Sequence, residues 1–134
     1  MMRHGWVSVS ILAALALTPC AARAEEAVWS VAGKQVLRLH ASAGDWTPQQ
    51  RVEALDERVN EILSKDGTLR ANEIVLQHTH GQVYITVRGT VLVTVLPGDA
   101  EPNHTSREKL AQVWLTNLRN TLPLLAPRVN QHGA

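Results

Sequence analysis

Alternation of apolar and polar residues, the period of half-buried β-strands, marks two regions of the chain. The first region, residues 28–41, has two short apolar stretches divided by Gly33-Lys34, an arrangement that predicts a β-hairpin. In its second stretch Leu37 and Arg38 fall on opposite faces. One face of this hairpin is therefore expected to be buried, and the other face is expected to meet water.

The second region, residues 73–96, reads as three consecutive strands. Its segments are rich in valine, isoleucine and threonine, and they are divided by His80-Gly81 and by Gly89. This pattern predicts a three-stranded meander whose middle strand has one buried face and one exposed face. The apolar face of that strand carries Val83, Ile85 and Val87, and the polar face carries Tyr84, Thr86 and Arg88.

Between these regions lies an apolar pattern at helical period, which begins after a strong helix-start signal. Thr47 is a favoured N-cap, Pro48 suits the first helical position, and Gln50 completes a capping box. The helix is expected to end at Gly67. Its apolar stripe consists of Val52, Leu55, Val59, Ile62 and Leu63, and charged residues fill the remaining positions.

A second helix is predicted after the turn-rich residues 96–104. Thr105 with Glu108 repeats the capping-box signature, and Pro123 is expected to end the helix after Leu122. The apolar positions at spacings of three and four are Leu110, Val113, Trp114, Leu118, Leu122 and Leu125.

The order of these elements predicts an α+β fold: β-hairpin, helix, three-stranded meander, helix. Two amphipathic helices can cover only one face of a mainly antiparallel sheet of about four or five strands, so we expect a two-layer sandwich. Trp114 is expected to be the largest side chain buried between the second helix and the sheet. The opposite face of the sheet, which is expected to meet water or a partner, carries Arg38, His40, Thr86 and Arg88.

The first 24 residues have the order of a secretory signal peptide, with a positive start, an apolar run over residues 7–17 and small residues at the cleavage site. The run is shorter than the ~18 to 20 apolar residues that span a bilayer, so cleavage after Ala24 is favoured over a membrane anchor. Pro19 disfavours the alternative of lipid attachment at Cys20. We therefore expect a periplasmic protein with a single domain over residues 25–134 and no transmembrane segment.

Charge and cysteine content narrow the classes of partner and chemistry. Loss of Arg3 and Arg23 with the signal peptide reduces the 13 basic residues to 11 against 12 acidic ones, a formal net charge of −1. Basic and acidic residues alternate without a basic stripe, which argues against a nucleic-acid partner. Cys20 is the single cysteine and leaves with the signal peptide, so neither a disulfide nor a cysteine nucleophile is expected.

No set of residues predicts an enzyme or a cofactor. The sequence has no serine-nucleophile motif and no glycine loop that cradles phosphate. Asp99 and Glu101 are neighbouring carboxylates, but an aspartate in a Pro-Gly-Asp turn usually bonds its own backbone. The sequence therefore favours a non-enzymatic module that binds an envelope protein through the polar face or an edge strand of its sheet. The candidate binding residues are Arg38, Tyr84, Thr86 and Arg88.

A periplasmic metal-binding protein is the alternative. His78 and His80 are two residues apart, and on a strand both side chains would point to the same side and could ligate a metal. Because zinc sites normally have three or four ligands, a third would have to come from His40, Glu73 or His104.

Three features carry a resemblance that covers nearly the whole chain after the signal peptide. They are the Thr47-Pro48 helix entry with Arg51 and Arg58, the strand from Val91 to Val95 leading to Asp99-Ala100, and the helix running from Leu110-Ala111 to Trp114. In these features the chain resembles the extracytoplasmic N-terminal domain that precedes the membrane helices of some small-conductance mechanosensitive channel proteins. Those channels continue into transmembrane helices, whereas no run long enough to span a membrane follows here. The resemblance implies an accessory sensing or interaction domain without conduction.

Overall fold

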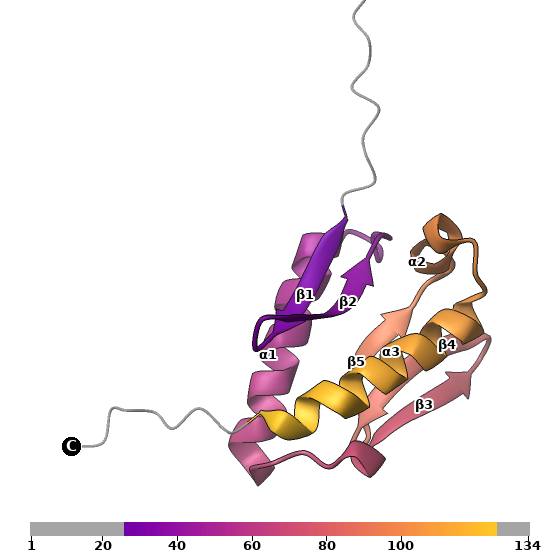
Figure 1. Cartoon of the computed structure of the whole chain (residues 1–134). Helices are drawn as coiled ribbons and strands as arrows, with labels where there is room; N and C mark the ends of the chain where they lie inside the picture. Colours follow the sequence, from indigo (N-terminus) through magenta and orange to yellow (C-terminus); the bar gives the residue numbers. More distant parts are fainter. Residues whose placement is uncertain (1–25, 126–134) are drawn as a thin grey trace, which may run out of the picture.

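The computed structural model describes residues 26–125, and the predicted signal peptide lies outside this range (Figure 1). Within these residues no helix has the length and apolarity needed to cross a membrane. The strands are β1 (Ala27–Val31), β2 (Lys34–Leu39), β3 (Ile74–Thr79), β4 (Gln82–Val87) and β5 (Thr90–Val95). The helices are α1 (Pro48–Asp66), α2 (Pro97–Ala100) and α3 (Arg107–Thr121), with short 3-10 turns η1 (Ala71–Glu73), η2 (Glu101–Asn103) and η3 (Leu122–Leu124).

The α+β class and the order of hairpin, helix, meander and helix are confirmed, and the strands divide into two antiparallel sheets where a single sheet was expected. β1 pairs with β2, and β3, β4 and β5 form the second sheet in that order. The reason lies at the edge of β5, where Arg58 of α1 donates to the carbonyl of Leu92 at 3.0 Å and Arg51 donates to that of Thr94 at 2.9 Å. Helix α1 thus occupies the place in which β2 could have joined the meander.

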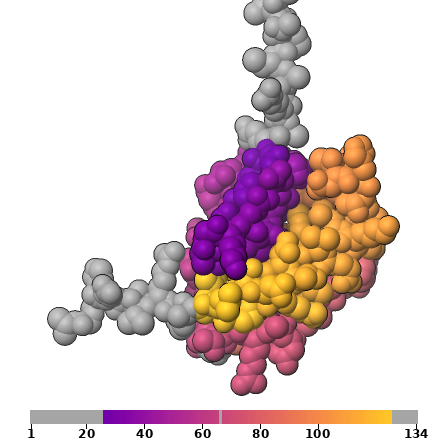
Figure 2. Space-filling view, in the orientation of Figure 1, coloured from indigo at the N-terminus to yellow at the C-terminus, as the bar shows by residue number. Residues whose placement is uncertain are grey.

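The two long helices therefore take different positions. Helix α3 packs on one face of the three-stranded sheet and also contacts β2, whereas α1 contacts the hairpin and β5. Figure 2 shows the hairpin and α3 side by side on one face of the molecule. Helix α3 consequently joins the two sheets into one core.

Local signals place the helix ends well. Thr47 and Gln50 form the predicted capping box, in which the Thr47 hydroxyl accepts from the Gln50 amide and the Gln50 side chain accepts from the Thr47 amide. The cap of α3 is Ser106, one residue after the predicted Thr105. The Ser106 hydroxyl accepts from the Lys109 amide at 3.2 Å, while the Thr105 amide donates to Ala100 and closes the preceding turn.

Each sheet contains one β-bulge, and a helix side chain satisfies the carbonyl of the extra residue. In the hairpin the extra residue is Val36, and in the meander it is Leu92. A bulge leaves such a residue without a ladder partner. Asn117 of α3 donates to the Val36 carbonyl at 3.0 Å, and Arg58 does the same at Leu92. Both bulge residues are buried, and so is the residue that follows each of them. Strict alternation of buried and exposed positions does not predict two consecutive buried residues.

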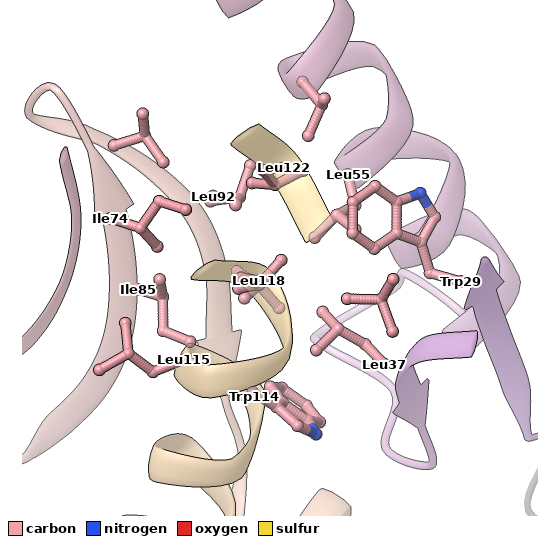
Figure 3. Close-up of a cluster of buried hydrophobic side chains, with 14 of the residues drawn as sticks. Trp29, Leu37, Leu55, Ile74, Ile85, Leu92, Trp114, Leu115, Leu118 and Leu122 are labelled. Carbon is pink, nitrogen blue, oxygen red and sulfur yellow. The ribbon is translucent and has the colours of Figure 1, made fainter. Parts of the chain in front are cut away.

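The core has two buried tryptophans, Trp29 and Trp114, and not Trp114 alone. On α3, Leu115 is buried and Val113 is 54% exposed, the reverse of the predicted stripe. A helix that packs at once on a sheet and on the hairpin buries a wider face, which Ala111 and Leu115 complete. Figure 3 shows side chains from both sheets and both long helices meeting in one cluster: Trp29, Leu37, Leu55, Ile74, Ile85, Leu92, Trp114, Leu115, Leu118 and Leu122.

Replacing Trp114 with alanine is expected to destabilise the fold far more than the same change at Trp46. Trp114 is buried in the core, whereas Trp46 is 47% exposed at the start of α1. A large-to-small change in a packed core costs about 3 to 5 kcal/mol, because it loses buried area and leaves a cavity. Urea denaturation followed by circular dichroism measures both variants, and a lower midpoint for Trp46→Ala than for Trp114→Ala would contradict the packing of α3.

Candidate functional site

The four predicted binding residues do not share one sheet. Arg38 lies on β2 in the hairpin, whereas Tyr84 and Thr86 lie on β4 and Arg88 follows it in the turn to β5. Thr86 is buried, Tyr84 is half-buried, and the two arginines are engaged in ion pairs. The expectation of one common polar face is therefore replaced by two separate surfaces.

Both arginines act within the fold. Arg38 pairs with Glu26 at 2.9 Å, which ties β2 to the residue before β1. Arg88 adopts a positive φ in the turn and pairs with Glu73 at 3.0 Å. It also donates to the carbonyl of Thr68 at 3.2 Å, so it holds the segment between α1 and β3 against the meander.

The other two predicted binding residues, Tyr84 and Thr86, lie on the outer face of the meander, opposite α3. Pairing across the strands places Thr86 between Val75 and Val91, and Tyr84 between Gln77 and Thr94. Val75 and Val91 are 41% and 40% exposed. We define this outer face by its six residues: Val75, Gln77, Tyr84, Thr86, Val91 and Thr94.

Sequence reasoning missed the two valines of the outer face. It counted the polar side of β4 only and left the facing residues of β3 and β5 unassigned. The available signal was the alternation of each flanking strand, in which Val75 and Val91 fall out of phase with the buried positions. A bulge at Leu92 obscures that phase in β5.

The two histidines of the metal-binding alternative occupy different backbone settings. His78 is exposed at the end of β3, and His80 lies in the turn with a φ of 51°, so strand alternation does not hold between them. Of the proposed third ligands, Glu73 is engaged by Arg88, and His40 lies beside Glu26 at the end of the hairpin. Residues 26–125 contain no group of three or more histidine, cysteine, aspartate or glutamate side chains placed to hold a metal ion.

Asp99 and Arg51 form a buried ion pair that connects three parts of the chain. The Asp99 carboxylate is fully buried, and its two oxygens accept from Arg51 at 2.9 and 3.0 Å. The same carboxylate accepts the backbone amides of His40 and Ala41 after β2, and that of Leu96 after β5. The predicted bond to its own turn is thus present, within a larger network.

The two terminal nitrogens of Arg51 also donate to backbone carbonyls. They donate to Ala41 at 2.6 Å and to Thr94 at 2.9 Å. Because five donors occupy the Asp99 oxygens, this carboxylate has no free position from which to accept a substrate proton. Glu101, the other carboxylate considered, is exposed in η2.

A groove of about 530 Å³ runs between β1 and α1. Its floor is apolar and includes Trp29 and Val59, and its rim carries Ser30, Asp56 and Ser64. Among residues 26–125, no histidine, lysine or cysteine lines the groove, and its ionisable side chains are the carboxylates of Asp56 and Glu61.

Replacing Asp99 with asparagine is expected to lower the free energy of unfolding by about 3 to 5 kcal/mol, because it leaves the Arg51 charge buried without a counter-charge. The matched control is Glu61→Gln, which removes the exposed pair between Glu61 and Lys65. That change should cost less than about 1 kcal/mol. Chemical denaturation of both variants gives the comparison, and equal costs would show that Asp99 does not hold the three segments together.

The pKa of Glu73 is expected to respond to Arg88. The backbone amide of Arg70 and then the side chain of Arg88 donate to the Glu73 carboxylate and hold its pKa below the usual range. The Arg88→Gln variant should raise this pKa toward its ordinary value, as measured by carboxyl NMR titration, and Arg38→Gln should leave it unchanged. Since the folded pKa is depressed, the stabilisation is present above the unfolded pKa and is lost as the pH falls through the folded pKa.

Comparison with known proteins places the chain in a family. Searches of the curated proteins and of the solved structures returned no match. A family match covers residues 27–123, which span the structure from β1 to η3. The chain belongs to the family described as Domain of unknown function (DUF8459).

Proposed function

We propose that this protein is a non-enzymatic module of the periplasm that binds an envelope protein through the outer face of its three-stranded sheet. The observation that carries the proposal is the exposure of Val75 and Val91 on either side of Thr86, on a face that neither long helix covers. Exposed apolar side chains held on a rigid sheet, with a tyrosine beside them, are typical of protein interfaces.

The chemistry of the rest of the molecule favours binding over catalysis. Asp99 has its oxygens occupied by five donors, and the described lining of the groove beside Trp29 places no histidine or lysine next to its serines. The periplasmic location rests on the signal peptide predicted for residues 1–24. The resemblance to an accessory domain of mechanosensitive channel proteins favours the same class of role.

Val91 and Val28 offer a matched test of this surface. Each valine is 40% exposed, Val91 on the outer face and Val28 on β1 of the hairpin sheet. A photo-reactive amino acid is placed at either position in the full chain, which is expressed in the cells that produce it. We expect one discrete adduct with an envelope protein from position 91 and none from position 28, because only the outer face is proposed to contact the partner.

A second variant tests whether the adduct reports specific binding. Tyr84→Asp, introduced together with the photo-reactive group at position 91, should reduce the adduct by about tenfold or more, since it puts a charge at the centre of the contact. Equal adducts from positions 28 and 91, or an adduct that Tyr84→Asp does not change, would show that the outer face is not the binding surface.

A further inference from the structure

The two edges of the three-stranded sheet differ in how their backbone groups are used. At β5, the carbonyls of Leu92 and Thr94 accept from arginines of α1, so that edge is closed. At β3, four of the six residues are exposed, and Arg119 of α3 donates to the carbonyl of Ile74, the first residue of the strand. Figure 1 shows β3 as the outermost strand of this sheet.

The turn between β3 and β4 determines which backbone groups of β3 face outward. Thr79 pairs with Gln82 across the two turn residues His80 and Gly81, both with positive φ. In such a turn the closing pair exchanges hydrogen bonds, and alternate residues along the strand then face away from the partner strand. The outward residues of β3 are Ile74, Leu76 and His78.

One of these three residues is already engaged. The Ile74 carbonyl accepts two bonds from the Arg119 side chain, at 2.8 and 3.1 Å. Within residues 26–125 no side chain and no loop or turn backbone bonds the outward groups of Leu76 and His78. These two residues therefore present two amides and two carbonyls for an additional strand.

The side chains of β3 do not oppose such pairing. The strand reads IVLQHT and carries no lysine, arginine, aspartate, glutamate or proline, the residues that natural edge strands use to repel another strand. When two copies of a strand pair antiparallel about a two-fold axis, the position of the axis determines which residue of one copy lies opposite which residue of the other. Only an axis at Gln77 pairs Leu76 with the partner's His78 at both ends, which uses all the free outward groups.

We propose that two copies of the chain pair antiparallel through β3 about an axis at Gln77, so that their three-stranded sheets form one continuous sheet. In this register ~4 backbone hydrogen bonds form between Leu76 and His78 of the two copies. On the outer face, Val75 lies opposite the partner's Thr79, and Gln77 lies opposite the partner's Gln77. No like charges meet across the axis. This inference is independent of the envelope partner proposed above.

Charge variants at Gln77 test both the pairing and its register. Gln77 is exposed, so a charge there is compatible with the fold, and on the axis the charge faces its own copy. The wild-type chain, recovered after export, should sediment as a dimer. The Gln77→Lys variant and the Gln77→Glu variant should each raise the dimer dissociation constant by about two- to fivefold. An equimolar mixture of the two should restore a dimer that contains one of each.

Gln49 provides the matched control, because it is exposed on α1, which packs on the hairpin and on β5 at the other edge of the sheet. Gln49→Lys and Gln49→Glu should leave the dimer unchanged. A wild-type chain that stays monomeric at its highest soluble concentration would overturn the proposal, as would Gln77 variants that dimerise like wild type or a mixture that fails to restore the dimer. Purified protein suffices for these measurements, so their outcome is separate from the cross-linking at position 91.

Discussion

The ion pair between Arg51 and Asp99 is the interaction on which the arrangement of this domain depends. Taking two charges out of water costs several kcal/mol for each ion, and their attraction offsets this only when every remaining donor and acceptor is satisfied. Here backbone groups from the end of the hairpin, from β5 and from the start of α2 supply additional hydrogen-bond partners to the two ions. The pair therefore requires these three segments, far apart in sequence, to lie at one point.

The ion pair also determines the path of helix α1. Once Arg51 is anchored at Asp99, Arg58 lies two turns further along the helix and reaches the bulged carbonyl of Leu92. The helix therefore runs along β5 and satisfies carbonyls that a fourth strand of this sheet would otherwise use. Closing one edge of the meander in this way separates the hairpin as its own sheet and leaves β3 as the edge with free backbone groups.

Local patterns predicted the elements, and long-range contacts decided how they assemble. The capping box at Thr47 and the alternation of β4 depend on neighbours in sequence, so both could be identified in advance. The separation of the sheets depends on arginines that reach across the fold, and charged positions on a helix are usually assigned to its solvated face. A signal was nevertheless present. Arg51 and Arg58 fall at helical spacing with Leu55, on the same stripe that enters the core.

The outer face was less predictable, because it consists of residues that lie side by side on three different strands. The polar side of β4 could be read from its sequence, but the residues facing it on β3 and β5 depend on register, which the turns and the Leu92 bulge determine together. The hairpin arginine at position 38 was grouped with Arg88 only because one sheet was assumed. Two sheets place them apart, and each instead pairs with a nearby glutamate.

Close approach of the backbone is the condition that allows the ion pair to form. A Cβ atom on Gly98 would lie 2.9 Å from the Cβ atom of Ala41, a distance that real side chains do not adopt. Gly98 thus lets α2 come close enough to the hairpin for the next residue, Asp99, to accept the amides of His40 and Ala41. Pro97 fixes the first position of that short helix, where its missing N–H costs nothing. The Pro-Gly-Asp segment is consequently explained by the needs of a buried charge and by backbone geometry, without any catalytic role for its carboxylate.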